Sequence, residues 1–339
     1  MVGEDKKRKV AILGWYGHKN FGDEIMLKGL HNLFHDWKIV PMSNTNTATV
    51  SAINFKEVNK CDLFVLGSGE LINSNRLFIH TPSFCGVKIP RLAHRLMNRT
   101  NMFNNISWVH KIKIPKVVLG CGVNVEAVSD LKKEVVSELE QFDYIGLRDQ
   151  ASVELLKSKV TLKNKVHLFY DLAFALRCNP TCIIQECKKM AVVIPTDRFT
   201  FSDRGVRQNQ IALKSIGWLK QKLVGFDKTV FLPFGQEDND DYTTCQYLSK
   251  ATKNSEVVSP ENICFQTVID YLASCEMVFS YRLHGLILSF ILGKRYEFYR
   301  YHWKLSRVHE TIKKLAPDEI MEHQQQEFKS MLRTVNLEG

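Results

Sequence analysis

Short apolar, β-branched runs recur along the chain, and most of them end in Gly, Asp, Ser or Pro. This pattern is typical of buried strands that stop at turns. In the first half of the chain the predicted strands are KVAILGWYG, WKIVPMS, DLFVLGSG, KVVLGCGV, YIGLRD and HLFYDLAFAL. In the second half they are MAVVIPTD, TVFLPFG, SEVVSP, EMVFSYR and RYEFYRY.

Amphipathic stretches separate these strands. Residues 130–142, 149–159 and 209–223 place apolar side chains three and four positions apart, which is the spacing of one helix face. Continuous apolar strands that alternate with helices indicate parallel sheets covered on both faces. The sequence therefore predicts an α/β protein built from doubly wound, Rossmann-like domains.

The strand and helix pattern lapses once, in RCNPTCIIQECKK at 177–189, and restarts at Met190. The 339 residues also exceed the usual size of one hydrophobic core. We predict an N-terminal domain over 8–180, a C-terminal domain over 188–310 and a helical tail over 311–339. Because doubly wound domains bind ligands at the carboxyl ends of their strands, we expect a ligand cleft between the two domains.

The composition, 45% hydrophobic and 24% charged, is that of a soluble globular protein. The best apolar run, Leu286–Leu292, is far shorter than the roughly 20 residues that cross a bilayer. The start of the chain, KKRK before a strand-length apolar run, lacks a cleavage site and favours a cytoplasmic location. The nine cysteines are scattered, and the cluster at 178–187 has no CxxC pair. We therefore expect free thiols and no metal site.

The formal net charge of +10 raises the question of an anionic partner. Nucleic acid is disfavoured because no recognition motif with interleaved aromatic residues appears. Basic residues gather at 88–116, which is either an ordinary solvated helix face or a surface for anionic substrates or lipids. Peripheral membrane contact through this segment is an open alternative.

The first candidate site is GWYGHKNFGDE, which follows the first predicted strand and precedes a helical pattern. Its glycines let the backbone turn tightly and approach a ligand. Asp23 and Glu24 stand at the helix start, where Asp23 is either a simple N-cap or a functional group. The spacing is not that of a dinucleotide fingerprint, and acidic residues would repel a pyrophosphate.

Two glycine turns follow other strands and are expected at the same sheet edge as this loop. They are Gly67-Ser68-Gly69 and Gly120-Cys121-Gly122. Arg148 and Asp149 also end a strand; Asp149 is most simply a helix cap, and Arg148 is either its partner or an anion ligand.

The second half offers three further strand ends. Asp197 and Arg198 follow one strand, and the acidic run Gln236–Asp241, interpreted as a solvated loop, follows another. Arg282 and His284 occupy the turn between an apolar strand and an apolar helix. Taken alone, they fit either a buried ion pair with a core histidine or an anion site.

Together, GWYGHKNFGDE, VLGSGELI, VLGCGVNVE, LRDQAS, YDLAFAL and FSYRLHGLILSFILGKR resemble, in order, the polysaccharide pyruvyl transferase family. The N-x-GDE loop and the S-x-R-x-H-G element are the most specific parts. The family often has glycine where Ser68 stands and proline where Arg295 stands. The resemblance runs from about Val10 to Lys304.

This resemblance implies transfer of a pyruvyl group from phosphoenolpyruvate to two hydroxyls of a sugar, within a GT-B-like two-domain fold. No metal or organic cofactor is required; the acceptor is a sugar or glycan, free or linked to a lipid, nucleotide or polymer. His284 is the expected general acid and Asp23 the expected base. Phosphoenolpyruvate would be bound by Arg282, Leu283, His284, Arg198, Arg148 and Lys304. The expected acceptor-side loops contain Asn20, Gly22, Asp23, Glu24, Gly67, Ser68, Gly69 and Gly122.

Two other function classes fit parts of the pattern. A nucleotide-sugar glycosyltransferase would use the same fold and an arginine-lined cleft. A non-catalytic carbohydrate-binding or scaffold protein would not require Asp23, Arg282 and His284 to lie together. The position of these three side chains therefore separates an enzyme from a scaffold.

Overall fold

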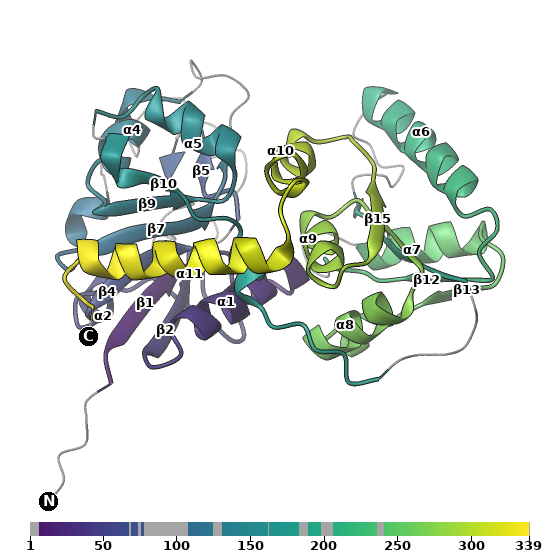
Figure 1. Ribbon diagram of the computed structural model, residues 1–339, viewed down its shortest axis with the longest axis horizontal. Coiled ribbons are helices and arrows are strands. Elements are labelled where there is room, and N and C mark those ends of the chain that lie inside the picture. Colours follow the sequence, from purple (N-terminus) through teal and green to yellow (C-terminus); the bar gives the residue numbers. More distant parts are fainter. Residues whose placement is uncertain are drawn as a thin grey trace, which may run out of the picture. The chain divides into compact units, whose positions relative to one another are not determined.

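The computed structural model describes residues 7–67, 69–73, 76–77, 108–124, 131–161, 163–182, 189–197, 206–235 and 241–338. The chain divides into two compact units (Figure 1). Unit 1 contains Met1–Trp15, Asp36–Leu168 and Lys329–Gly339. Unit 2 contains Tyr16–His35 and Phe169–Phe328.

Unit 1 is built on a seven-stranded parallel sheet with the order β10-β9-β7-β4-β1-β2-β3. Its central strands are continuous apolar runs, and every residue of β4 is buried, as expected for a sheet with both faces covered. The order reverses between β1 and β4, which is the doubly wound arrangement. The strands are β1 (Lys9–Leu13), β2 (Lys38–Ser43), β3 (Ser51–Ala52), β4 (Leu63–Gly67), β7 (Lys116–Cys121), β9 (Tyr144–Leu147) and β10 (Val166–Leu168).

Shorter elements complete unit 1. A three-stranded sheet contains β5 (Ile72–Asn73), β6 (Arg76–Leu77) and β8 (Val123–Asn124). Helices α4 (Lys133–Leu139) and α5 (Gln150–Lys157) bury apolar side chains in the same core cluster as strands β1, β4, β7 and β9. The remaining described helices are α2 (Phe55–Val58), η2 (Val109–Lys111) and η4 (Lys163–Lys165).

Unit 2 repeats this plan on a smaller scale, with a five-stranded parallel sheet in the order β13-β12-β11-β14-β15. The order reverses between β11 and β14, so the carboxyl ends of these two strands frame the position where doubly wound domains bind ligands. The strands are β11 (Met190–Ile194), β12 (Lys228–Phe231), β13 (Ser255–Val257), β14 (Met277–Ser280) and β15 (Arg295–Phe298).

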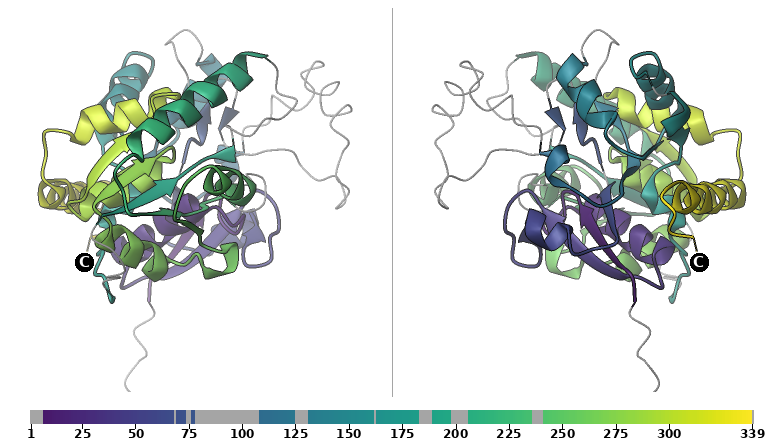
Figure 2. Two further views of the ribbon diagram at one scale, coloured as in Figure 1. Left: turned by 90° about the vertical axis from the view of Figure 1, so that its right-hand side faces the viewer. Right: turned by 90° about the vertical axis from the view of Figure 1, so that its left-hand side faces the viewer.

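Helices lie on both faces of the sheet of unit 2, and the left view of Figure 2 shows α6 and α8 on opposite sides of it. Helices α6 (Val206–Lys222) and α7 (Asp241–Lys250) contribute to the apolar cluster on one face. Helix α9 (Leu283–Ile291) approaches β11 and β14 closely through Gly285. The other helices of the unit are η5 (Leu172–Ala175), η7 (Pro260–Asn262), α8 (Phe265–Ser274) and α10 (Trp303–Ile312). Helix α11 (Pro317–Thr334) begins in unit 2 and ends in unit 1.

Helix α1 (Phe21–Leu33) belongs to unit 2, although it follows β1 of unit 1 in the chain. The Phe21 amide donates to the Phe234 carbonyl at 2.8 Å, and the two rings pack with centroids 4.4 Å apart. Further along the helix, Gly29 lies against η5: a Cβ at this position would be 2.0 Å from the Leu172 carbonyl oxygen. These contacts place α1 against η5 and the segment that follows β12.

The structure therefore differs from the predicted division of the chain. The units change at residues 168–169 rather than near 178–189, and α1 clusters with the second unit. The predicted strand HLFYDLAFAL is also wrong beyond Leu168. Tyr170 has a φ of 64°, and the Asp171 side chain accepts the Ala173 amide, so this segment turns into η5 instead of extending β10.

Candidate active site

Two charged residues leave the carboxyl ends of β11 and β14, the strands on either side of the reversal in unit 2. Ile194 pairs with Ser280 at the ends of these strands; Asp197 and Arg282 follow within a few residues. Parallel strands end at one edge of a sheet, so both side chains start from the same edge. The predicted position of Arg282 at a strand end is confirmed.

Arg282 is held by buried carboxylates. Its Nε donates to Asp241 Oδ2 at 2.9 Å, its Nη2 donates to Asp241 Oδ1, and Nη2 lies 3.7 Å from Asp197 Oδ1. Burial by itself lowers the pKa of the guanidinium, but the adjacent Asp241 outweighs it, so the pKa of Arg282 is raised and the group stays charged. Among the described residues, these contacts use Nε and Nη2 of the guanidinium.

Asp241 explains the rigid position of Arg282. It is fully buried, and it also accepts the amide hydrogens of Asp197 and Gly235, each at 2.8 Å. The acidic run Gln236–Asp241 was expected to be a solvated loop; this expectation is wrong for Asp241, while residues 236–240 lie outside the described ranges. Only the sheet topology brings Asp241 under Arg282, because 41 residues separate the two in sequence.

Helix α9 begins directly after Arg282. Arg282 is its N-cap residue, and no side chain caps the first turn. The first amide groups of a helix point outward and carry the positive end of its dipole, which favours an anion. The predicted helix start at Leu283 and His284 is confirmed.

His284 lies in the first turn of α9, against the backbone of α1. A Cβ on Gly22 would be 2.2 Å from His284 Nδ1, so only glycine at this position lets the ring approach so closely. The other ring nitrogen, Nε2, is 3.6 Å from Asp171 Oδ1 and has no hydrogen bond to any described residue. A buried imidazole nitrogen in this state is unusual and calls for a ligand or a chemical role.

Asp171 is a site residue that the sequence pattern did not indicate. It is fully buried, caps η5, and its carbonyl accepts the Gln324 side-chain amide at 3.0 Å. Its motif, YDLAFAL, is predicted from sequence only as a strand and as part of the family resemblance. The signal available in the sequence was the aspartate within an apolar run, since aspartate side chains favour turns and caps over strands.

Asp23 lies in the first turn of α1 and forms a cluster with Asp171, Arg282 and His284, which we call the Asp23 cluster. Asn20, not Asp23, caps this helix, because the Asn20 side chain accepts the Gly22 amide. Asp23 is 7% exposed, and burial, followed by the nearby charge of Glu24, raises its pKa to about 8. Lys304 and Arg282 act in the opposite direction, and Asp171 adds to the rise. Asp23, Arg282 and His284 thus lie in one cluster within unit 2, rather than on opposite domains as predicted.

Arg148 and the glycine turns belong to unit 1. Arg148 is 2% exposed, donates to Glu70 Oε1 at 2.8 Å and lies 3.5 Å from Asp149 Oδ2. Gly122 leaves the space that its guanidinium fills. Two carboxylates thus flank this buried charge, and the anion-binding role of Arg148 stays a prediction. Asp149 caps α5, as predicted.

The remaining predicted residues are placed as follows. Gly67 ends β4, and Gly69 accepts the Gly122 amide at 2.9 Å. Glu24 accepts the Gly17 amide at 2.7 Å. Lys304 lies in the first turn of α10, where its amide donates to the His302 side chain that caps the helix. Ser68, Arg198 and most of the basic 88–116 segment lie outside the described residues.

Neither a metal cluster nor a membrane span is found in the part of the chain that the structure describes. No group of three or more His, Cys, Asp or Glu side chains there is arranged to hold a metal ion. None of the helices described is long and apolar enough to cross a bilayer. The seven cysteines within the described ranges are free thiols.

The family model of polysaccharide pyruvyl transferases matches residues 20–295, which contain Asp23, Asp171, Arg282 and His284 but not Lys304. The chain belongs to the polysaccharide pyruvyl transferase family. A transferase role in polysaccharide biosynthesis follows from this membership. The comparison with curated proteins found no match.

Solved structures show the fold. The S. aureus protein MnaA, in a co-structure with UDP, matches with a TM-score of 0.53 at 10% identity, over 98% of this chain and 97% of that chain. At this identity the likeness concerns the fold alone, and it supports the predicted GT-B-like class of two Rossmann-like domains. A functionally uncharacterised Klebsiella pneumoniae protein matches at 16% identity, with a TM-score of 0.46 and coverage of 91% and 88%.

Proposed function

We propose that this member of the polysaccharide pyruvyl transferase family transfers the pyruvyl group of phosphoenolpyruvate onto two hydroxyls of a sugar, forming a cyclic ketal. The observation that carries the proposal is the buried His284 Nε2, which has no hydrogen bond to a described residue and lies between Asp171 and the first turn of α1. Two cationic groups suited to an anionic donor, Arg282 and Lys304, act on the pKa of Asp23.

Phosphoenolpyruvate carries a phosphate and a carboxylate, so its site requires several positive groups. Arg282 supplies a fixed guanidinium, and the uncapped start of α9 supplies the amide groups of Leu283 and His284. Lys304 is near enough to Asp23 to lower its pKa, and so provides a further cation in the same cluster. Arg198 is retained as a predicted ligand from sequence.

The reaction balances with these groups. One proton adds to the terminal methylene carbon of phosphoenolpyruvate and makes it a methyl group. Two sugar hydroxyl oxygens form bonds to the neighbouring carbon, while its bond to the phosphate oxygen breaks. Of the two hydroxyl protons released, one replaces the proton added to carbon and the other leaves with phosphate. An acid and a base are therefore needed.

Asp23 and His284 form this acid–base pair. The sequence suggested His284 as the acid and Asp23 as the base. A carboxyl with a pKa of about 8 holds its proton at neutral pH, so we assign Asp23 as the proton carrier of the ligand-free enzyme. His284, beside the Asp171 carboxylate, then receives the proton of the attacking hydroxyl, and Asp171 orients and stabilises the resulting imidazolium.

The test measures phosphate release and ketal mass gain with phosphoenolpyruvate and a panel of glycan acceptors. We expect His284→Ala and Asp23→Ala to lose roughly 10²–10⁴-fold in kcat/KM, the scale of a general acid or base. His110→Ala, at an exposed histidine of η2, is the matched control and should keep full activity. Near wild-type rates in either cluster variant would remove the corresponding role. A chain that transfers sugars from nucleotide donors but never releases phosphate from phosphoenolpyruvate would overturn the proposal.

A further inference from the structure

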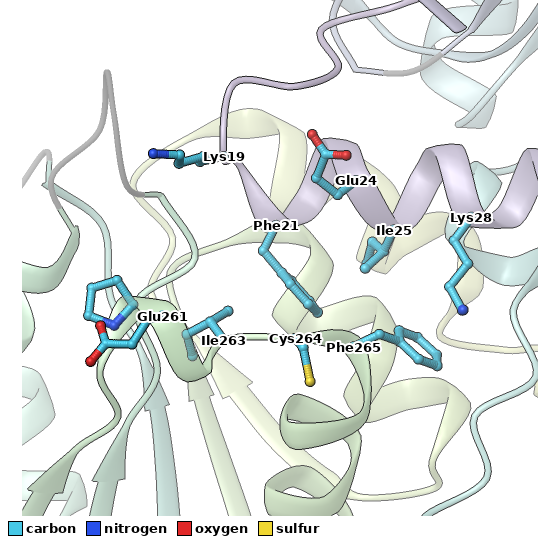
Figure 3. A pocket seen from close by; sticks show the side chains of 10 residues that line it. Lys19, Phe21, Glu24, Ile25, Lys28, Glu261, Ile263, Cys264 and Phe265 are labelled. Atoms are coloured by element: carbon cyan, nitrogen blue, oxygen red, sulfur yellow. The ribbon is translucent and has the colours of Figure 1, made fainter. Parts of the chain in front are cut away.

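A pocket of about 490 Å³ opens beside α1, within unit 2 (Figure 3). One wall is the helix face formed by Phe21, Glu24, Ile25 and Lys28, which share a side because they are three and four residues apart. The opposite wall is the segment 260–265, which leads from η7 into α8. The volume lies within the range of sites that hold a small molecule or one sugar unit.

The inner surface of the pocket is mainly apolar. Phe265 and Ile263 are half-buried on one wall, and Phe21 and Ile25 form the other (Figure 3). The Lys28 ammonium lies 4.9 Å from the centre of the Phe265 ring. Aromatic rings of this kind offer a flat apolar surface to the C–H face of a sugar ring.

The charges that line the pocket cancel. Lys19 and Lys28 contribute two positive charges, and Glu24 and Glu261 contribute two carboxyl groups. A phosphate or carboxylate ligand would face both carboxyl groups, so phosphoenolpyruvate or a nucleoside diphosphate is disfavoured here. Sugar hydroxyls both donate and accept hydrogen bonds, and can therefore pair with the ammonium and the carboxyl groups alike.

The pocket is next to the Asp23 cluster but separate from it. Asp23 and Glu24 are consecutive residues of α1, and consecutive side chains of a helix point about 100° apart. Glu24 lines the pocket, while Asp23 belongs to the cluster with His284 and Arg282. A ligand that fills the pocket is thus displaced from the reacting atoms by one face of the helix.

We propose that this pocket is a subsite for a neutral sugar unit of the acceptor glycan, adjoining the unit that receives the pyruvyl group. The proposal rests on the proposed function and specifies its substrate class: an uncharged acceptor of at least two sugar units. The apolar walls bind the ring face, the balanced charges bind hydroxyls, and the position beside Asp23 directs the neighbouring unit to the acid–base pair.

Cys264 provides a direct reporter of occupancy, because its exposed thiol lines the pocket at the N-cap of α8. Hydrogen bonds from Thr267 lower its pKa, which favours alkylation. The His284→Ala variant is treated with iodoacetamide, and peptide mass spectrometry follows each thiol. N-acetyllactosamine, lactose, maltotriose and chitotriose are the probes, each at about 10 mM, because single sugar subsites bind weakly. The exposed Cys182 is the internal control.

We expect at least one oligosaccharide to slow Cys264 alkylation about threefold or more while Cys182 reacts unchanged, and phosphoenolpyruvate to have no effect on Cys264. Failure of all four probes to protect Cys264, or protection by phosphoenolpyruvate instead, overturns the subsite. The alkylation experiment does not depend on turnover of the His284→Ala variant. Protection of Cys264 by a sugar, together with no ketal-forming activity in the wild type, would therefore support the sugar subsite and reject the proposed function.

A kinetic comparison of two acceptors provides a second test of the subsite. Phe265→Ala removes one aromatic wall, and should raise KM for an oligosaccharide acceptor about tenfold without changing kcat/KM for the matching monosaccharide. Tyr247→Ala, at an exposed aromatic residue of α7 outside the pocket, should change neither. Equal losses for the two acceptors in Phe265→Ala would mean a general structural effect and would contradict the subsite.

Discussion

At the scale of the residue, the active cluster depends on side chains whose ordinary chemistry is altered by burial. Asp23 would be ionised at neutral pH in water, yet its position raises its pKa to about 8. Arg282 keeps its charge because Asp241 lies beneath it. His284 approaches α1 because residue 22 has no side chain. Each of these effects depends on one specific neighbour, so each can be tested by substitution.

Asp23→Asn should make stability less sensitive to pH. In the unfolded chain the carboxyl has its ordinary pKa of 3.8, whereas in the folded chain burial raises the pKa to about 8. Between these values the folded state binds more protons, so stability falls as pH rises, by up to roughly 1.4 kcal/mol per pH unit. The Asn variant lacks this loss. Its stability relative to wild type should therefore increase between pH 5.5 and pH 7.5 in urea unfolding.

The control for this pH experiment is Asp318→Asn, at an exposed position in the first turn of α11. Its stability relative to wild type should not change across the same interval. If Asp23→Asn and wild type have parallel pH profiles, then the Asp23 carboxyl is ionised in the folded protein, and its assignment as the proton carrier would have to be withdrawn.

At the scale of the element, the contact between α1 and η5 positions the two acidic members of the cluster, Asp23 and Asp171. The Asn32 side chain donates to the Ala175 carbonyl at 2.9 Å, and Gly29 brings the helix against Leu172. Amphipathic periodicity predicts that α1 is a helix with a buried face. It does not predict that this buried face packs on η5, because the apolar pattern of the η5 segment predicts a strand instead.

Gly29→Ala and Gly217→Ala should have opposite effects on stability. Both place a methyl group in a helix, where alanine is intrinsically favoured by up to about 1 kcal/mol. At Gly29 the methyl would lie 2.0 Å from a backbone oxygen, and α1 must move to relieve it. At Gly217, in α6, nothing lies within 4 Å. We expect loss of roughly 1–3 kcal/mol at Gly29 and a small gain at Gly217.

Chemical denaturation of both glycine variants, each compared with wild type, measures this difference. The Gly29 variant should also lose activity, since α1 carries Asp23. A Gly29→Ala protein as stable as the Gly217 variant would show that α1 does not pack tightly on η5.

At the scale of the whole molecule, the chain folds as two α/β units, and the Asp23, Asp171, Arg282 and His284 cluster lies entirely in unit 2. Its members come from three regions of the sequence: α1, the start of η5, and the turn between β14 and α9. The proposed donor site therefore draws its residues from one folded unit, and its ligand should stabilise that unit.

Phosphoenolpyruvate should raise the melting temperature of the wild-type protein. A ligand that binds only the folded state stabilises it by about 2.7 kcal/mol at 100 times its dissociation constant. UDP, which would suit a nucleotide-sugar glycosyltransferase, should leave the transition unchanged. The measurement is a thermal scan with each compound at the same concentration. A shift with UDP but none with phosphoenolpyruvate would favour the glycosyltransferase alternative.

Local chemistry explains what could be predicted from the sequence. Apolar runs with turn residues after them predict parallel strands, since both faces of such strands must be buried. Ten of the eleven predicted runs contain a described strand over most of their apolar residues. The exception is HLFYDLAFAL, which contains only the end of β10. The position of Arg282 and His284 between β14 and α9 follows from the same pattern. The ordered motifs are specific enough to predict the family, and the family-model match over residues 20–295 confirms this prediction.

The sequence by itself thus determined the α/β class, the strand ends and the family. Tertiary structure decided which charged groups meet: Asp241 under Arg282, Asp171 beside His284, and Asp23 in the same unit as both. The physical reason is that strand and helix formation depend on neighbours a few residues away, whereas burial, pKa and ion pairing depend on neighbours in space. In this protein those neighbours are separated by 41 residues for Arg282 and Asp241, and by many more for His284 and Gly22.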